Sequence, residues 1–225
     1  MASTLDVASH GRLHAGIGAG WYEHEWRAYG YGFPETRERM GMFREAAEII
    51  HKMWTEDYPT FEGRHYTIDA PINEPKGVRK PHPSLWIGGG GERVTLKIVA
   101  QYSDACNFGN GNPEIVRRKL DVLKRHRDAL GRDYDEIIKS TEIKCVLLDG
   151  ETDREQATAA TRELLDVSYE EFSKSYWVGT SEEIAEQLRP VIDAGIDYVI
   201  HYVLRVAYDH RPMQQFAREV IPQCA

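Results

Sequence analysis

The strongest constraint on the fold is the regular alternation of short apolar strand patterns with helical patterns along the chain. Strands that are separated by helices favour parallel pairing, with the helices covering the sheet. The sequence therefore predicts an α/β fold built from successive strand and helix units. The strand patterns lie at residues 12–18, 85–88, 104–108, 139–148 and 196–204.

Helical periodicity fills the intervals between these strands. One pattern runs from Glu35 to Trp54 and keeps its apolar residues on one face. A second has Asn112 as its N-cap and Pro113 at its first helical position, and it ends near Gly131. A capping box of Thr180 and Glu183 begins a third. Further helical patterns cover residues 91–102, 152–174 and 213–220.

One segment interrupts the alternation. Residues 55–83 hold five prolines and a predicted hairpin at residues 60–67. We interpret this segment as an insertion after a helix rather than a domain boundary. The chain has 225 residues, of which 41% are apolar, so it can bury one substantial core, and we predict a single domain over residues 1–225.

Composition excludes several classes of protein. The net charge of −8 argues against wide contact with nucleic acid, and the basic residues between Arg117 and Arg127 are interpreted as a solvated helix face. No apolar run approaches the roughly 20 residues of a membrane helix, and no signal peptide is evident. Cys106, Cys145 and Cys224 lack CxxC spacing, which favours reduced thiols and a cytoplasmic location.

Two glycine clusters follow predicted strands. The first, Gly16–Trp21, does not fit the dinucleotide-binding pattern GxGxxG, because Trp21 stands where the last glycine belongs. The second, Gly88–Gly91, is not a P-loop, because no Gly-Lys-Ser/Thr follows. Four glycines let a ligand approach the backbone, and a helix that begins near Gly91 would present N–H groups to an anion. The alternative is a tight turn without a ligand.

Taken together, these stretches resemble the luciferase-like monooxygenase family, most closely its branch that uses the deazaflavin coenzyme F420. The stretches are Leu5–Val7, Gly11–Leu13, Gly16–Trp21 with Glu25, Leu85–Gly91, Val178–Leu188 and Ala194–Ile200. The resemblance implies a TIM (β/α)8 barrel with an insertion before its fifth strand. It also implies that this chain is N-terminally truncated and holds an incomplete barrel, strands four to eight only.

The resemblance further implies where a cofactor lies. In the family, the turns after the fourth and fifth strands hold the cofactor phosphate and ring edge. Trp21 occupies the position of a catalytic glutamate in the family's sugar-phosphate dehydrogenases, and an indole cannot transfer that proton. No catalytic residue is assigned. The implied cofactor-binding residues are Ala19, Gly20, Trp21, His24, Gly88, Gly89, Gly90, Gly91, Arg93 and Val94.

Other single residues point less clearly to chemistry. Trp21 is as well explained by core packing, and His24 by the polarity of a surface helix. His14 and His201 are interpreted as core histidines with satisfied hydrogen bonds. The nine histidines show no metal-ligand spacing such as HExxH, so no metal site is predicted, and the absence of GxSxG argues against a hydrolase.

The leading hypothesis is an oxidoreductase that transfers hydride between reduced F420 and a small organic substrate. An FMN-dependent luciferase-like monooxygenase is the alternative within enzymes. An inactive fragment or an interaction subunit is the alternative outside them. We expect a homo-oligomer without nucleic-acid or membrane partners. If three strands are absent, two sheet edges stay unpaired, and we expect the chain alone to be poorly soluble, to assemble through those edges and to turn over no substrate.

Overall fold

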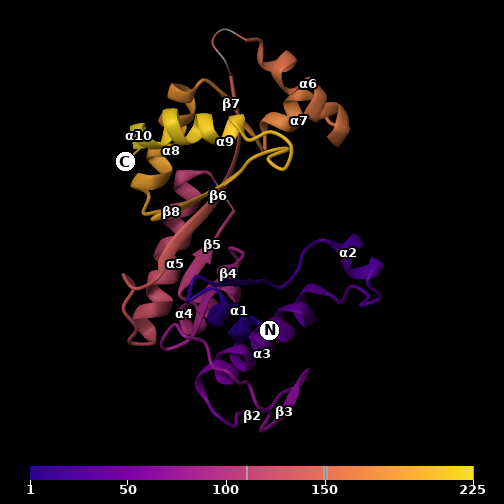
Figure 1. Ribbon diagram of the computed structural model, residues 1–225, viewed down its shortest axis with the longest axis vertical. Coiled ribbons are helices and arrows are strands. Elements are labelled where there is room, and N and C mark those ends of the chain that lie inside the picture. Colours follow the sequence, from indigo (N-terminus) through magenta and orange to yellow (C-terminus); the bar gives the residue numbers. More distant parts are fainter. Residues whose placement is uncertain (110, 149, 151, 225) are drawn as a thin grey trace. The chain divides into compact units, whose positions relative to one another are not determined.

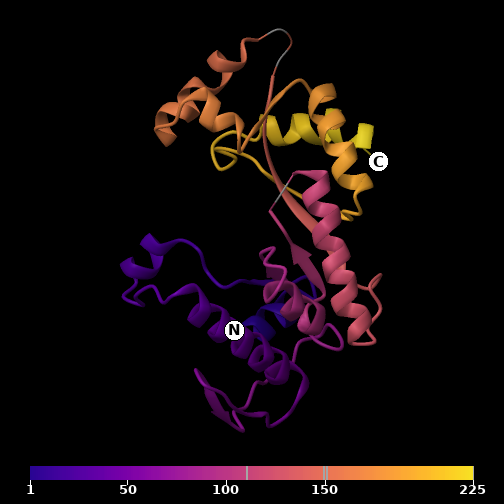
Figure 2. The same cartoon turned by 180° about the vertical axis from the view of Figure 1, so that it is seen from behind.

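The computed structural model describes residues 1–109, 111–148, 150 and 152–224 (Figures 1 and 2). The chain divides into two compact units, each with its own strands and buried side chains. Unit 1 consists of Met1–Asn107 and Lys119–Ile138, and unit 2 consists of Phe108–Arg118 and Lys139–Ala225.

Unit 1 contains three parallel strands in the order β1-β4-β5. They are β1 (His14–Ile17), β4 (Ser84–Gly88) and β5 (Ala105–Asn107). Ile17 pairs with Ile87, and Ile87 pairs with Cys106, so the carboxyl ends of the strands meet. Leu85 and Ile87 are fully buried, and burying such a side chain contributes about 1.5–3 kcal/mol.

The helices of unit 1 supply the other half of this core. They are α3 (Thr36–Thr55), α4 (Thr95–Tyr102) and the part of α5 (Pro113–Ala129) from Lys119 onward, with the shorter α1 (Ala2–Ala8) and α2 (Glu23–Ala28). Asn112 caps α5 as predicted, because its side-chain oxygen accepts the N–H groups of Glu114 and Ile115. Buried residues include Phe43, Ala47, Leu96, Val99, Leu120 and Leu123.

The predicted hairpin is confirmed as β2 (Thr60–Glu62) and β3 (Thr67–Asp69), which pair antiparallel. Its turn is fixed to α3 by one side chain. The carboxylate of Glu45 accepts the backbone N–H groups of three successive turn residues, Arg64, His65 and Tyr66, at 2.8–3.0 Å. These bonds keep the inserted segment against the helix that precedes it.

Unit 2 is built on the long strand β6 (Ile138–Leu147). β8 (Tyr198–Tyr202) pairs with β6 over Ser140–Lys144, and β7 (Trp177–Gly179) pairs with the next stretch, Cys145–Leu147, both in parallel. β7 was not among the five predicted strands. It leads directly into the capping box of the next helix, and its pairing with β6 defines it as a strand.

Helices surround β7 and β8 in unit 2. The predicted helix over residues 152–174 is two helices, α6 (Arg154–Leu165) and α7 (Tyr169–Ser173), because Asp166 adopts a left-handed conformation and Ser168 caps the next helix. α8 (Ser181–Asp193) begins with the predicted capping box. The chain closes with α9 (Arg211–Gln215), a π-helical turn (Phe216–Val220) and α10 (Ile221–Cys224).

The five predicted strands are confirmed as β1, β4, β5, β6 and β8, each within two residues of its predicted ends. The described residues thus form an α/β fold with six parallel strands rather than five. None of the helices in that part of the chain is long and apolar enough to cross a membrane. None of the three cysteines, all described, forms a disulfide bond.

Candidate cofactor site

The two predicted glycine turns lie side by side in unit 1. They follow β1 and β4, which pair up to Ile17 and Ile87, and a Cβ atom built on Gly18 would lie 3.4 Å from the carbonyl oxygen of Gly88. The end of β5 joins them, because the Asn107 carbonyl accepts the N–H of Gly89 at 2.8 Å. In sheets of parallel strands, ligands bind at this carboxyl end.

The turn after β4 requires its glycines. Gly89 has φ of +116°, and a Cβ atom on Gly91 would lie 2.9 Å from Thr95 Oγ1. A Cβ atom on Gly90 would lie 2.6 Å from Lys119 Nζ. Side chains at these positions would fill the space through which a ligand can reach the backbone.

The helix after this turn begins later than predicted. α4 starts at Thr95 with Val94 as its N-cap, so the prediction of a helix N-terminus near Gly91 is wrong. The Leu96 N–H reaches back to the Gly91 carbonyl at 3.0 Å, which closes the turn before the helix starts. Arg93 therefore lies exposed in the turn rather than on the helix.

A cation that the sequence analysis assigned to solvent reaches this turn. Lys119 on α5 is partly buried, and its ammonium donates a hydrogen bond to the Gly90 carbonyl. One face of α5 continues the contact, because a ring nitrogen of His126 lies 3.1 Å from the Glu92 carbonyl. The solvated-face interpretation is also wrong for Arg127, which is 1% exposed and hydrogen-bonds the Asp133 carbonyl. Burial lowers the pKa of that guanidinium.

The turn after β1 is built around Gly20. This residue has φ of +71°, and its Cα faces the indole of Trp26, so a side chain there would collide with the ring. Trp21 is 84% exposed and contacts Tyr22, with ring centroids 5.4 Å apart. His24 is exposed and lies 5.9 Å from the Tyr22 ring. Core packing therefore does not explain Trp21.

The strands below the two turns expose a further aromatic pair. His14 lies edge-on to Trp86, with ring centroids 5.2 Å apart, and Trp86 donates to Ser84 at 3.1 Å. These side chains occupy the sheet face opposite Ile17 and Ile87, and His14 is exposed there. The interpretation of His14 as a core histidine is wrong, because its side chain is exposed, whereas Ile87 on the opposite face is buried.

The comparisons with known proteins follow this geometry. Residues 1–173 match the family described as luciferase-like monooxygenase. The chain belongs to the luciferase-like monooxygenase family. This luciferase-like chain is 29% identical to an F420-dependent glucose-6-phosphate dehydrogenase of Kineococcus radiotolerans, over 98% of the chain and 71% of that relative. It is 24% identical to an FMNH2-dependent dimethylsulfone monooxygenase of Pseudomonas putida, over 98% of the chain and 68% of that relative.

The solved structures agree on the fold. An F420-dependent secondary alcohol dehydrogenase, in complex with an F420-acetone adduct, superimposes with a TM-score of 0.80 at 20% identity. The match covers all of the luciferase-like chain and 73% of that structure. The α/β fold with parallel strands is therefore that of the luciferase-like barrels, of which the chain covers about 73%.

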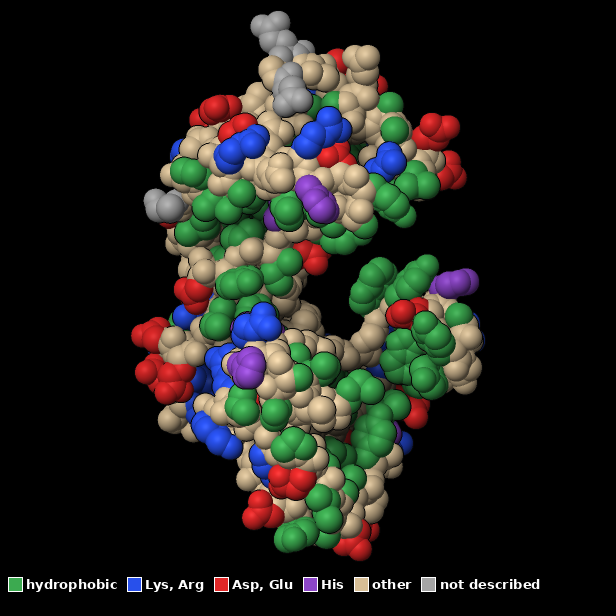
Figure 3. Space-filling model, in the orientation of Figure 1, with side chains coloured by type: hydrophobic (Ala, Val, Ile, Leu, Met, Phe, Trp, Pro, Cys, Tyr) green, Lys and Arg blue, Asp and Glu red, His purple; other side chains and the backbone are tan. Residues whose placement is uncertain are grey.

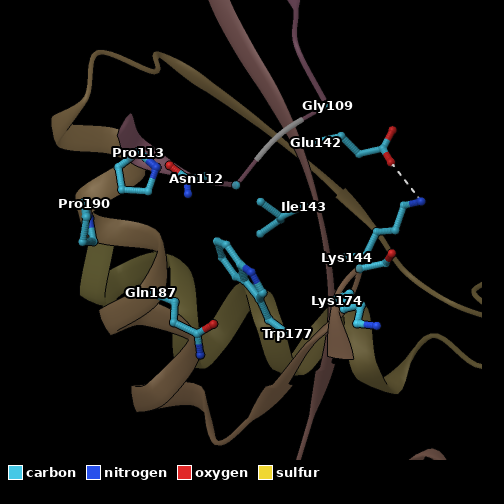
Figure 4. A pocket seen from close by; sticks show the side chains of 12 residues that line it. Gly109, Asn112, Pro113, Glu142, Ile143, Lys144, Lys174, Trp177, Gln187 and Pro190 are labelled. Atoms are coloured by element: carbon cyan, nitrogen blue, oxygen red, sulfur yellow. Dashed lines mark ion pairs between the residues drawn. The ribbon is translucent and has the colours of Figure 1, made fainter. Parts of the chain in front are cut away.

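Unit 2 of the luciferase-like chain has a separate cavity of about 670 Å³ (Figure 4). The indole of Trp177 packs beside Gly111, where a Cβ atom would come within 2.5 Å of the ring. Lys144 lies 3.7 Å from the Glu142 carboxylate and 5.7 Å from the Tyr202 ring centroid. No sequence pattern pointed to this cavity, although Glu142 and Lys144 alternate along β6. Asn112, Lys174, Gln187 and Pro190 also line the cavity.

His201 is the satisfied, half-buried histidine that the sequence predicted. Its Nε2 atom lies 3.0 Å from Cys145 Sγ, and its ring lies 4.2 Å from the Phe216 ring. Burial lowers the pKa of His201 and raises the pKa of the Cys145 thiol to about 12. Both groups are therefore neutral at pH 7, and the thiol is not poised as a nucleophile. Within the described residues, no three His, Cys, Asp or Glu side chains are grouped to hold a metal ion.

Proposed function

We propose that this protein is an oxidoreductase that binds F420 and transfers hydride between the reduced cofactor and a small organic substrate. The observation that supports the proposal is the pair of glycine turns at the carboxyl ends of β1 and β4, with the Lys119 ammonium at Gly90. The F420-dependent relative and the F420-bound alcohol dehydrogenase of the same fold also support it.

The residues present fit the anionic part of such a cofactor. The backbone of Gly88, Gly89 and Gly91 is exposed, and side chains at Gly90 and Gly91 would fill the approach. Lys119 at the Gly90 carbonyl and the exposed Arg93 of the same turn supply positive charge. A phosphate there would receive charge-assisted hydrogen bonds, which are stronger than neutral ones.

Each part of the chain has a distinct task in this proposal. The β4 turn would bind the phosphate, and Lys119 would neutralise it. The turn at Ala19 and Gly20, with Trp21 beside it, would orient the planar ring against the sheet face that exposes His14 and Trp86. When bound, the cofactor supplies a hydride, which is two electrons with one proton, or accepts it in the reverse reaction.

The sugar-phosphate substrate of the relatives is not part of the proposal. The resemblance implies a catalytic glutamate at the position of Trp21, and an indole neither donates nor accepts a proton in that role. The substrate class proposed is therefore a small organic molecule that needs no acid or base at position 21. No residue of this chain is assigned as catalytic.

Fluorescence titration of the 225-residue chain with F420 and with FMN tests the proposal. We expect F420 to bind and Lys119→Met to raise its Kd by about tenfold or more, because hydrogen bonds to charged groups contribute about 1.5–3 kcal/mol. Lys124→Met is the matched control, since Lys124 is on the same helix but pairs with Asp128 in solvent. Equal Kd values for the two variants would contradict the site.

The FMN-dependent monooxygenase remains a second candidate, favoured by the FMNH2-dependent relative with the same coverage of the chain. Both functions use the same turns, so the bound spectrum and the reaction with oxygen separate them. Tight FMN binding, with oxygen consumption by the reduced complex, would select the monooxygenase. Binding of F420 alone would select the hydride-transfer enzyme.

A homo-oligomer is proposed with this function. Exposed aromatic side chains on α2 and its flanks, such as Tyr29 and Tyr31, suit a protein interface. Size-exclusion chromatography with light scattering gives the mass directly, and a mass of one chain at micromolar concentration would contradict the proposal.

A further inference from the structure

The segment after β1 makes a long excursion before the chain returns to α3. We name residues 20–34, which include α2, the aromatic loop. Figures 1 and 2 show α2 at the far end of this segment, and Figure 3 shows hydrophobic side chains gathered over it. Trp21, Tyr29 and Tyr31 are 84%, 69% and 73% exposed, and no residue of α2 is buried.

One side chain joins both ends of the aromatic loop to α3. Arg39 donates from Nε to the Pro34 carbonyl at 3.0 Å and from its guanidinium to the Gly20 carbonyl. The same group hydrogen-bonds Thr36 Oγ1 at 3.3 Å and lies 4.2 Å from the centre of the Phe33 ring. The planar fork of arginine can serve these acceptors at once, and a lysine cannot.

The packing at the base of the loop is small. Trp26 meets Phe33 edge to face, with ring centroids 5.9 Å apart, and these two residues are the partly buried aromatic side chains of the loop. Gly20, Gly30 and Gly32 all have positive φ, a conformation that other residues rarely adopt. With so little apolar burial, the loop depends on its polar contacts at Arg39.

We infer that Arg39 is a positioning residue for cofactor binding, because it fixes the Gly20 peptide and thereby the direction of Trp21. This inference rests on the proposed function. The Gly20 carbonyl belongs to the turn beside Gly88, and Trp21 is the next residue along the chain. With Arg39 in place, the Trp21 and Tyr22 rings, 5.4 Å apart, form a wall beside that turn for a planar conjugated ring.

Trypsin cleavage and cofactor titration test this role together. Arg27 lies on α2 with 63% of its side chain exposed, and cleavage after it requires local opening of the loop. We expect Arg39→Met to speed formation of the 1–27 fragment by about tenfold, the equivalent of about 1.4 kcal/mol. The same variant should raise the Kd of the bound cofactor, and Arg39→Lys should restore only part of each effect.

Arg37→Met is the matched control. Arg37 is on the same helix but lines the cavity between α3 and the hairpin. The cleavage rate and the cofactor Kd of the Arg37→Met variant should therefore equal the wild-type values. Thermal unfolding of every variant monitors the fold. If Arg39→Met loses its cooperative melt, Phe33→Leu tests the same contact, because it removes the ring beneath the guanidinium and keeps the arginine.

The outcomes separate the role of Arg39 in holding the aromatic loop from the proposed function. If Arg39→Met is cleaved at the wild-type rate, Arg39 does not hold the loop. Faster cleavage with an unchanged Kd would overturn the positioning role. If the wild-type chain binds neither F420 nor FMN, the proposed function fails and the positioning role fails with it, whereas the cleavage rates still decide whether Arg39 holds the loop.

Discussion

The turn after β4 and the turn after β1 lie side by side, but they are held in different ways. The turn after β4 returns to its helix at Thr95, and its glycines face the Thr95 side chain and the flexible end of Lys119. The turn after β1 continues into the aromatic loop and returns to α3 at Thr36. Arg39 on that helix hydrogen-bonds both ends of the excursion.

This difference separates two ways of building a ligand site. The β4 turn is closed by a nearby residue, because the Leu96 N–H bonds the Gly91 carbonyl, and Asn107 and Lys119 add contacts from other elements. A long excursion with few buried side chains is specified by a contact 19 residues away, between Gly20 and Arg39. Substitutions in the first turn should therefore affect binding, and substitutions in the second should affect stability as well.

Gly20→Val should have the largest effect. Valine would have to adopt φ of +71°, which costs roughly 1–2 kcal/mol, and its side chain would collide with the Trp26 ring. Overpacking adds about 1–3 kcal/mol, so we expect the free energy of unfolding to fall by about 3 kcal/mol in urea denaturation. Gly16→Val is the control, because no atom lies within 4 Å of a Cβ there. Equal unfolding midpoints would contradict the packing argument.

Acid should release the hairpin but not the aromatic loop. Burial raises the pKa of Glu45, but the three backbone hydrogen bonds together lower it by more than burial raises it. The pKa of Glu45 is therefore below its ordinary value of 4.5. A carboxylate whose pKa is lowered by folding stabilises the folded state at pH values above its ordinary pKa. That stabilisation is lost as the pH falls through the lowered pKa of the folded state. The Arg39 hydrogen bonds at the two ends of the aromatic loop go to backbone carbonyls and involve no carboxylate.

Amide hydrogen exchange can measure this contrast. After correction for intrinsic rates, protection of the Arg64, His65 and Tyr66 amides should fall between pH 6 and pH 3. In Glu45→Gln, protection should be low at both pH values, because the amide keeps a single acceptor oxygen. Loss of protection at the Tyr31 amide, which bonds the Trp26 carbonyl, over the same pH range would contradict the contrast.

Gly90→Val should affect binding more than stability. Its Cβ would meet the far end of Lys119, which can move, so we expect a loss of less than about 1 kcal/mol in unfolding free energy. The displaced ammonium and the filled approach should raise the cofactor Kd by about tenfold or more. Fluorescence titration measures the Kd, with circular dichroism to confirm folding. An unchanged Kd in a folded variant would remove this turn from the site.

Local signals in the sequence were sufficient for much of the fold. The five longer strand patterns, the Asn112 cap and the capping box at Thr180 all depend on neighbours within a few residues, and the structure confirms them. β7 was missed because Trp177–Gly179 runs directly into the capping box at Thr180, and its pairing with β6 defines it as a strand. The start of α4 was misplaced because glycine composition does not show where a turn ends.

The sequence predicted the glycine turns of the candidate site but not the lysine that contacts one of them. Lys119 stands 29 residues from Gly90, among several basic residues of one helix, and the sequence does not show which of them faces the turn. His14 was misassigned because alternation shows that two faces differ but not which one helices cover. Arg39 was missed for the same reason as Lys119, since both are single cations that act through distant carbonyls.

Arg93→Ala should have the smallest effect and sharpen the comparison within the β4 turn. Arg93 is exposed in the turn, and exposed ion pairs contribute about 0.2–1 kcal/mol, so we expect its loss to raise the cofactor Kd by no more than about fivefold. Lys119 is partly buried and hydrogen-bonds the turn directly, so Lys119→Met should raise the Kd more than Arg93→Ala does.

Kd values over a range of NaCl concentrations separate the roles of Arg93 and Lys119. If Arg93 pairs with an anionic group of the cofactor, its removal should flatten the salt dependence of binding. A salt slope equal to that of the wild type would show that Arg93 faces solvent and that Lys119 supplies the charge at this turn.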